Sequence, residues 1–373
     1  MNKFQELGLN SSILKAIEDM GFESPSEVQE KTIPILLDEE TDMVALAQTG
    51  TGKTAAFGFP LIQKIDPKSK HTQALILSPT RELCLQITNE LKNYSKYEPS
   101  LHPVAVYGGA SITDQAKQIE RGAQIIVATP GRMQDMIRRK LTDISKIEYC
   151  VLDEADEMLS MGFKKELDEI LCFLPAIENK WLFSATIPHG IQEIISKHLA
   201  EDAERIEVSR YNVINKNISH QYVKCTDDEK LHTLQLFLKS ERENRGVIFC
   251  KTKAATQKLA KQLIAKNIAT DAIHGDLLQK ERDKVMRAFK NETLRVLVAT
   301  DVAARGIDIS GLTFVAHYQL PESDEYYTHR SGRTARAGKE GISMCFANNY
   351  EVKILRNYER TLGIKFRQVK EVR

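Results

Sequence analysis

Short aliphatic and β-branched runs recur along the whole chain, and each is followed by a helical pattern. They occupy residues 43–47, 74–77, 125–128, 149–152, 181–183, 246–249, 296–299, 314–316 and 342–346. Continuous apolar runs, rather than alternating ones, are typical of parallel strands that are buried on both faces. The pattern therefore predicts an α/β protein with two doubly wound parallel-sheet lobes in tandem.

A boundary between the lobes is indicated near the middle of the chain. Residues 201–205 and 210–215 are polar and have no clear apolar period, which is typical of a connection between domains. We predict an opening segment at 1–30, a first lobe at 31–205, a linker at 206–216 and a second lobe at 217–373.

Composition excludes several classes of protein. The 373 residues are 42% hydrophobic and 28% charged, as in ordinary globular domains. The longest stretch without a charged side chain, 99–113, contains prolines and glycines and is shorter than a membrane-spanning helix. No secretory signal is visible, and the six cysteines are widely separated, without a metal-binding spacing. We therefore expect a cytoplasmic protein that has no contact with a membrane.

The overall charge balance conceals an asymmetry between the halves. Residues 1–205 have 22 basic and 31 acidic side chains, whereas residues 206–373 have 30 and 20, giving net charges of −9 and +10. The positive half favours a polyanionic partner. Mutual attraction of two oppositely charged lobes explains the asymmetry equally well.

A phosphate-binding loop is indicated between an apolar strand and a helical pattern. Its small residues allow backbone N–H groups to surround phosphates at a helix N-terminus. Lys53 is expected to reach the β and γ phosphates, and the Thr54 hydroxyl to bind Mg²⁺. The candidate nucleotide-binding residues of this loop are Ala47, Gln48, Thr49, Gly50, Thr51, Gly52, Lys53 and Thr54.

Two further groups fit phosphoryl transfer. Asp153 and Glu154 follow a buried strand, where Asp153 can hold Mg²⁺ and Glu154 can position or deprotonate the attacking water. In the second half, Arg330, Arg333 and Arg336 alternate with small residues. We expect their guanidinium groups to reach out together and to stabilise the transition state at the γ-phosphate.

With these motifs in order, the chain resembles a DEAD-box RNA helicase of superfamily 2 nearly end to end. Residues 153–156 read Asp-Glu-Ala-Asp, the tetrapeptide that names the family, and residues 21–29 match its Q-motif. The resemblance implies two RecA-like lobes, ATP and Mg²⁺ as cofactors, and RNA as partner. It also implies that Phe4 stacks on adenine and that the Gln29 amide pairs with the adenine edge.

The resemblance assigns further roles residue by residue. Asp156 and His329 join the catalytic set, Asp308 contacts the ATP ribose, and Ser184 and Thr186 couple hydrolysis to unwinding. The implied RNA-contacting residues are Pro79, Thr80, Arg81, Gly108, Gly109, Thr129, Pro130, Arg132, Gln279, Arg282, Thr300 and Arg305. Few of them are aromatic, so we expect a grip on the RNA backbone without sequence specificity.

The sequence departs from the family at two positions in the arginine-rich segment. Ser331 stands where the family usually has Ile, and Ala335 where it usually has Gly. Ser331 removes an apolar anchor, and Ala335 disfavours a positive φ that Gly would allow.

The expected function is that of a monomeric ATP-dependent RNA helicase. It closes two lobes on ATP and single-stranded RNA, separates short duplexes locally, and resets on hydrolysis. An ATP-gated RNA clamp or scaffold with little unwinding activity is the principal alternative, because its sequence would look almost the same. A DNA-directed helicase of the same superfamily is a second candidate, and a P-loop transporter or metabolic ATPase is a more distant one.

Overall fold

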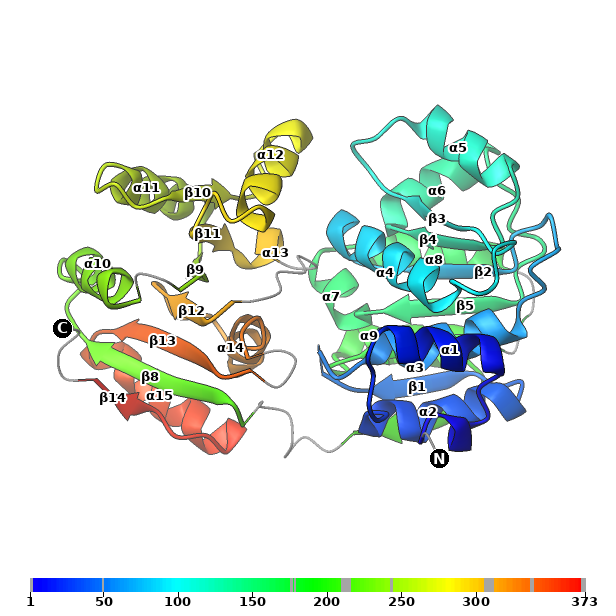
Figure 1. Cartoon of the computed structure of the whole chain (residues 1–373), viewed down its shortest axis with the longest axis horizontal. Coiled ribbons are helices and arrows are strands. Elements are labelled where there is room, and N and C mark those ends of the chain that lie inside the picture. Colours follow the sequence, from blue (N-terminus) through cyan, green and yellow to red (C-terminus); the bar gives the residue numbers. More distant parts are fainter. Residues whose placement is uncertain are drawn as a thin grey trace. The chain divides into compact units, whose positions relative to one another are not determined.

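The chain folds into two compact units, each built around its own sheet (Figure 1). The computed structural model describes residues 3–48, 50–174, 177, 179–208, 216–241, 244–304, 312–335 and 339–369. The units comprise Met1–Val208 and Ser209–Arg373.

The first unit contains a seven-stranded parallel sheet with the order β3-β4-β2-β5-β6-β1-β7. Its strands are β1 (Met43–Leu46), β2 (Ala74–Leu77), β3 (Pro103–Val106), β4 (Ile125–Ala128), β5 (Tyr149–Asp153), β6 (Lys180–Ser184) and β7 (Glu204–Glu207). Its helices are η1 (Gln5–Leu7), α1 (Ser11–Asp19), α2 (Glu27–Asp38), α3 (Lys53–Lys64), α4 (Arg81–Tyr94), α5 (Ile112–Glu120), α6 (Pro130–Arg138), α7 (Ala155–Ser160), α8 (Lys164–Phe173) and α9 (His189–His198).

The second unit also contains a seven-stranded parallel sheet, with the order β10-β11-β9-β12-β13-β8-β14. Its strands are β8 (Ile218–Lys224), β9 (Gly246–Cys250), β10 (Thr270–Ile273), β11 (Val296–Thr300), β12 (Phe314–His317), β13 (Gly341–Ala347) and β14 (Arg367–Gln368). Its helices are α10 (Lys230–Ser240), α11 (Lys253–Ile264), α12 (Gln279–Lys290), α13 (Asp301–Ala304), α14 (Asp324–Ser331) and α15 (Asn349–Leu362).

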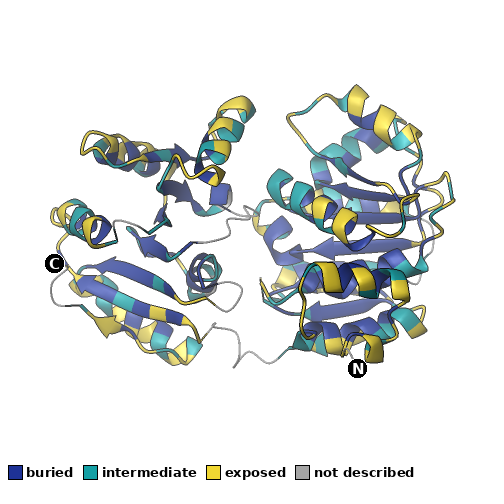
Figure 2. Ribbon diagram, viewed as in Figure 1, coloured by how far each residue is buried: buried dark blue, intermediate teal, exposed yellow. Residues whose placement is uncertain are grey.

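Both sheets are covered by helices on both faces, which confirms the expected doubly wound α/β class. In the first unit, α1–α4 pack on one face and α5–α9 on the other. In the second unit, α10 and α11 cover one face and α12–α15 the other. The central strands are buried throughout, whereas the helices are exposed along their outer sides (Figure 2). Continuous apolar strands are stable here because both of their faces leave water.

The predicted linker overlaps the first unit at its start. β7 pairs with β1 through Glu207, so residues 206 and 207 complete the first sheet. β8 begins at Ile218, and residues 209–215 of the predicted linker lie outside the described part of the chain. Among the described residues, no helix has the length and apolar character that crossing a membrane requires.

Candidate active site and nucleic-acid interface

The phosphate-binding loop joins β1 to the N-terminus of α3. Gly50 and Gly52 adopt φ of +85° and +92°, and the hydroxyl of Thr51 donates to the Gln48 carbonyl over 2.7 Å. Positive φ at two positions turns the chain back on itself before α3 begins, leaving the helix N-terminus to face an anion. Ala47 donates its backbone N–H to the carbonyl of Ser184, which ties the loop to β6. Thr49 lies outside the described residues.

The Gln29 side chain links the start of α2 to this loop. Its Oε1 accepts the Ser26 backbone N–H over 3.0 Å, and its Nε2 donates to the Gly52 carbonyl over 3.1 Å. A Cβ at Gly52 would lie 2.4 Å from that Nε2, so only glycine permits this contact. The Q-motif is therefore in direct contact with the phosphate-binding loop.

Phe4 is placed in the core of the first unit. Its side chain is 1% exposed and packs edge-on against Phe59 of α3, with ring centroids 6.3 Å apart. In this arrangement Phe4 holds the opening segment against α3, and its stacking on adenine stays a prediction.

Lys53 forms a buried ion pair with Glu154. The Lys53 Nζ lies 2.9 Å from Glu154 Oε2, and the two side chains are only 5% and 10% exposed. Burial alone would lower the pKa of Lys53, but the charges of Glu154 and Asp153 outweigh it and raise that pKa. Lys53 is thus held as a cation beside two carboxyl groups.

The backbone at Glu154 is unusual for a residue with a side chain. Its φ of 51° and ψ of 53° are left-handed, and its N–H donates to the Asp153 carboxylate over 3.0 Å. Strained backbone of this kind costs about 1–3 kcal/mol and is concentrated at functional sites. It turns the chain sharply between β5 and α7, so that both carboxyl groups stay at the end of the strand.

The residues for a magnesium site fit the chemistry of that ion. Burial and the charge of Glu154 raise the pKa of Asp153 to about 7, although the charge of Lys53 opposes this rise. A second cation beside this carboxyl would therefore stabilise its charged form. Mg²⁺ in nucleotide sites takes one or two protein oxygens together with phosphate oxygens and water. Thr54, half-buried at the start of α3, supplies a hydroxyl. Among the described residues, no group of three or more His, Cys, Asp or Glu side chains could hold a metal ion.

Asp156 connects the acidic segment to the end of β6. Its Oδ2 accepts the Thr186 backbone N–H over 2.8 Å and the Thr186 hydroxyl over 2.9 Å. The Ser184 hydroxyl accepts the Asp156 N–H over 3.2 Å and donates to the Thr186 carbonyl over 2.7 Å. Three of these bonds join Asp156 to the segment of Ser184 and Thr186, the residues that the resemblance predicts to couple hydrolysis to unwinding.

Three predicted RNA-contacting segments of the first unit lie at one edge of its sheet. They follow β2, β3 and β4, which are neighbours, so their carboxyl ends lie together. They contain Pro79, Thr80, Arg81, Gly108, Gly109, Thr129, Pro130 and Arg132.

Local contacts hold these segments in place. Thr80 caps α4 by accepting the Leu83 N–H, and Arg81 stacks 4.5 Å from the centroid of the Tyr107 ring. Arg132 donates to the Ala110 carbonyl over 3.1 Å and so supports the exposed Gly108–Gly109 turn. An edge built this way presents backbone N–H groups and cationic side chains, which suits phosphate.

In the second unit, two of the predicted RNA-contacting residues, Thr300 and Arg282, meet at the end of β11. Arg282 of α12 donates to the Ala303 carbonyl over 2.8 Å, and Ala303 donates its N–H to the Thr300 hydroxyl. Gln279 begins α12 and donates to Asp283 over 2.8 Å. Arg305 and Asp308 lie outside the described residues.

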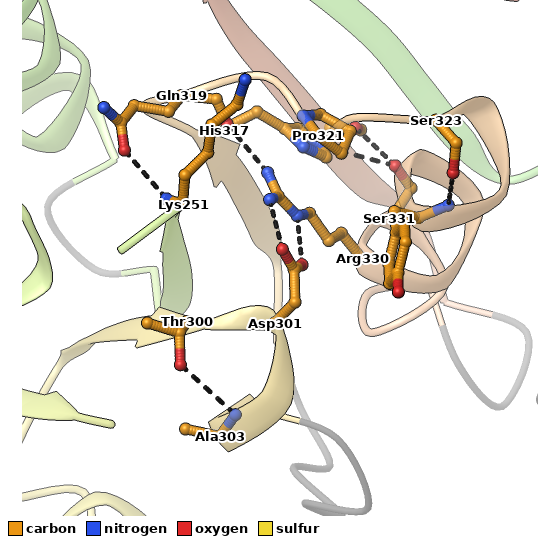
Figure 3. A network of polar contacts seen from close by, with 12 residues as sticks. Lys251, Thr300, Asp301, Ala303, His317, Gln319, Pro321, Ser323, Arg330 and Ser331 are labelled. Carbon is orange, nitrogen blue, oxygen red and sulfur yellow. Dashed lines mark hydrogen bonds and ion pairs between the residues drawn. The ribbon is translucent and has the colours of Figure 1, made fainter. Parts of the chain in front are cut away.

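The expectation that three arginines reach out together is wrong for Arg330. Its side chain is 2% exposed, and it forms two bonds to the Asp301 carboxylate of 2.5 and 2.7 Å and a third, of 2.8 Å, to the Gln319 carbonyl (Figure 3). A buried guanidinium is stable only when it is paired in this way. Arg330 therefore has a structural role inside the second unit, where it links Asp301 to the Gln319 backbone.

The rest of the arginine-rich segment lies at the end of α14. His329 and Arg333 are half-buried, and Arg336 lies outside the described residues. Ala335 does adopt the positive φ, 56°, that its side chain disfavours, and it is fully buried. The segment thus holds a strained backbone two residues after Arg333.

Some partners in the site were missed by sequence reasoning. Asp301 and Gln319 hold Arg330, and Tyr107 supports Arg81. A buried arginine needs an acidic partner. Asp301 directly follows Thr300, a predicted RNA contact, so the sequence could have suggested Asp301 as that partner. Gln319 and Tyr107 carried no signal beyond lying near the ends of strands.

Comparisons with known proteins agree with this geometry. The DEAD/DEAH box helicase model matches residues 26–194, and the helicase conserved C-terminal domain matches residues 229–338. The ATP-dependent RNA helicase CshA of Listeria monocytogenes is 44% identical over 361 residues, which cover 97% of this chain and 69% of the relative. The DEAD-box ATP-dependent RNA helicase CshA of Geobacillus kaustophilus is 41% identical over 370 residues, 99% of this chain and 79% of the relative.

A solved structure matches over almost the same length. S. cerevisiae Dbp5 bound to RNA and ADP BeF3 has a TM-score of 0.89 and 31% identity, covering 99% of this chain and 96% of Dbp5. The chain belongs to the DEAD-box helicase family. Within that family it is an ATP-dependent RNA helicase, and the alternative of an RNA clamp with little unwinding activity is not favoured.

Proposed function

We propose that ATP and single-stranded RNA together draw the two lobes into a closed state in which short RNA duplexes are separated locally, without sequence specificity. Hydrolysis of ATP then resets the lobes. The observation that carries the proposal is that Lys53 pairs with Glu154, while Asp156, two residues further along the chain, is bonded to Thr186. A change at the γ-phosphate would reach Thr186 through these contacts and the chain between them.

Each residue has a distinct task in the proposed mechanism. Lys53 binds the β and γ phosphates, for which it must leave its ion pair with Glu154 and so frees that carboxylate. Glu154 then orients the attacking water and accepts its proton. The Thr54 hydroxyl and Asp153 would hold Mg²⁺, which would supply positive charge at the phosphates when bound. Arg333 and Arg336 come from the second lobe to stabilise the transition state.

The RNA grip is proposed to be divided between the lobes. In the first lobe, the edge formed by the ends of β2, β3 and β4 binds the backbone, and in the second lobe the segment around Thr300 and Arg282 does so. If ATP closes both lobes on one strand, ATP and RNA must strengthen each other's binding by linkage.

The working form is proposed to be a monomer in the cytoplasm. All six cysteines are unpaired, and five are buried, as is typical of a reducing compartment. Sedimentation of the pure protein with and without RNA tests the monomer.

Separation of binding from turnover tests the proposal. Glu154→Gln keeps the shape of the side chain and removes the base, so it is expected to retain ATP-dependent RNA binding and to stop RNA-stimulated ATP hydrolysis. Lys53→Ala is expected to abolish nucleotide binding. Continued turnover by the Glu154→Gln protein would refute the assignment.

A further inference from the structure

A buried polar cluster lies between α14 and the sheet of the second unit. Tyr327 and Ser331 are four residues apart and so share one face of α14. Facing them are His317 at the end of β12, Ser343 in β13 and His220 in β8. The four side chains other than His220 are at most 1% exposed, and His220 is 7% exposed. None of the five has a part in the proposed mechanism.

Ser343 is the centre of the cluster. Its Oγ lies 2.9 Å from the Tyr327 hydroxyl, 2.9 Å from the Ser331 hydroxyl and 3.0 Å from His317 Nε2. The Tyr327 hydroxyl also lies 2.6 Å from His220 Nδ1, and Ser331 lies 3.4 Å from His317 Nε2. Each hydroxyl has one hydrogen to donate and two lone pairs. Every contact has a donor and an acceptor when the His317 Nε2–H is shared between the two serine hydroxyls and the His220 Nδ1–H donates to Tyr327.

The imidazoles are held neutral. Burial lowers the pKa of His220 to about 4, and burial together with the charge of Arg330 lowers the pKa of His317 well below its ordinary value. The His317 ring also stacks on Tyr327, with centroids 4.8 Å apart. The cluster consequently keeps one hydrogen-bonding state throughout the neutral range of pH.

The Ser331 hydroxyl holds this end of α14 through hydrogen bonds to the sheet side. An apolar contact tolerates small rotations and shifts of a helix, whereas hydrogen bonds between buried partners fix both. Ser331 directly follows the braced Arg330 (Figure 3), and its carbonyl accepts the Thr334 N–H over 3.2 Å. The turn that contains Arg333 therefore begins on a residue fixed from the sheet side.

We propose that Ser331, Tyr327 and Ser343 are positioning residues for the turn that contains Arg333. The hydroxyl cluster sets the direction in which this turn presents its arginine. The inference rests on the proposed function insofar as Arg333 acts on ATP. It adds that the rate of hydrolysis depends on hydroxyl groups that touch neither nucleotide nor RNA.

Two variants remove a hydroxyl without adding volume. Ser331→Ala and Tyr327→Phe are each expected to slow single-turnover hydrolysis of ATP, with RNA present, by about tenfold, because a shift of the turn weakens a contact made in the transition state. The dissociation constant for ATP should stay within about twofold, because the phosphate-binding loop is in the other unit. The double variant should be slowed by about tenfold relative to wild type, as each single variant is, because both changes break the same cluster.

Tyr358→Phe is the matched control. Tyr358 lies in the same apolar cluster, 5.7 Å from the Tyr327 ring, and its buried hydroxyl donates to the Pro321 carbonyl over 2.9 Å outside the hydroxyl cluster. It should lose as much thermal stability as Tyr327→Phe and hydrolyse ATP at the wild-type rate. Wild-type rates in both cluster variants, or an equal slowing in Tyr358→Phe, would overturn the inference.

Arg333→Ala separates this inference from the proposed function. If Arg333→Ala hydrolyses ATP normally, the role of Arg333 fails, and the inference fails with it. If Arg333→Ala is slow while Ser331→Ala and Tyr327→Phe are normal, only the positioning role is overturned.

Discussion

Asp156 accepts two hydrogen bonds from Thr186, one from the backbone N–H and one from the hydroxyl, through the same carboxylate oxygen. The pair joins the first turn of α7 to the segment after β6, and Asp153 and Glu154, the two carboxyl groups of the candidate ATP site, directly precede α7. Movement of one loop therefore cannot occur without strain or breakage at the other.

Removal of the Thr186 hydroxyl tests this coupling. Thr186→Val has nearly the same shape and keeps the backbone bond, so ATP binding and hydrolysis should be reduced by no more than about threefold. Duplex separation should fall by about tenfold or more, since a charge-assisted hydrogen bond of about 1.5–3 kcal/mol is lost from the connection. Steady-state ATPase and strand-displacement assays on one preparation measure both.

Thr186→Ser is the control for that experiment. It keeps the hydroxyl and should retain most of the strand displacement. Parallel losses of ATPase and displacement in Thr186→Val would show that the bond supports the catalytic site itself and does not couple it to RNA.

Arg333 is predicted to act in the transition state. Arg333→Ala should slow single-turnover hydrolysis by about 10³ and change ATP affinity only modestly, as is typical of an arginine that stabilises developing charge. Arg360→Ala removes an exposed arginine of α15 and should leave the rate unchanged. A rate in Arg333→Ala within a few-fold of wild type would exclude the role.

The backbone grip on RNA predicts a strong dependence on salt. If about five phosphates are bound, the logarithm of the affinity for single-stranded RNA should fall with the logarithm of salt concentration with a slope near −3.5. Arg81→Ala should reduce the slope by about 0.7, since one phosphate contact is lost. A slope near zero would contradict backbone recognition, and equal stimulation of the ATPase by RNA and by DNA of the same sequence would favour a DNA-directed helicase.

Gly52 is predicted to be required for the contact between the Q-motif and the phosphate-binding loop. Gly52→Ala adds a Cβ 2.4 Å from Gln29 Nε2 at a residue with φ of +92°. Backbone strain should lower the free energy of unfolding by about 1–3 kcal/mol, and displacement of Gln29 should weaken ATP binding as well.

Gly122→Ala separates these two effects. Gly122 has φ of +104°, but nothing lies within 4 Å of its Cβ position, so the substitution adds strain without a clash. It should cost similar stability and leave the dissociation constant for ATP unchanged. Equal ATP affinities in the two variants would show that the Gln29 contact has no part in binding.

The sequence predicted the central strands well and the edges poorly. All nine apolar runs became strands, since a strand that is buried on both faces must be apolar throughout. β7 and β14 lie at sheet edges, are mostly exposed and contain charged residues, so apolar patterning could not reveal them. β8 alternates between buried and more exposed positions over its first residues, so it contains no continuous apolar run.

The candidate site was predictable to the extent that its residues are consecutive in sequence. The phosphate-binding loop and the acidic tetrapeptide are local, whereas the partners of Arg330 come from two separate segments. The burial of Arg330 could not be inferred from its spacing, because alternation with small residues does not tell which side of a short helix faces the sheet. The hydroxyl cluster has the same character: its five members lie on four elements.

The neutral state of His220 predicts how stability depends on pH. Its pKa is lowered by burial to about 4 in the folded chain, whereas the ordinary value in an unfolded chain is about 6.5. Between these values the unfolded chain binds a proton that the folded chain does not, so stability falls as the pH is lowered from about 6.5 to about 4. The contribution of His220 to this fall is about 3 kcal/mol.

The His220→Asn variant tests this prediction, because asparagine cannot titrate. Its free energy of unfolding, measured by urea unfolding followed by circular dichroism, should decline less steeply as the pH is lowered. The control His232→Asn changes an exposed histidine and should decline as wild type does. Identical declines in the His220→Asn and wild-type proteins would mean that folding does not lower the pKa of His220.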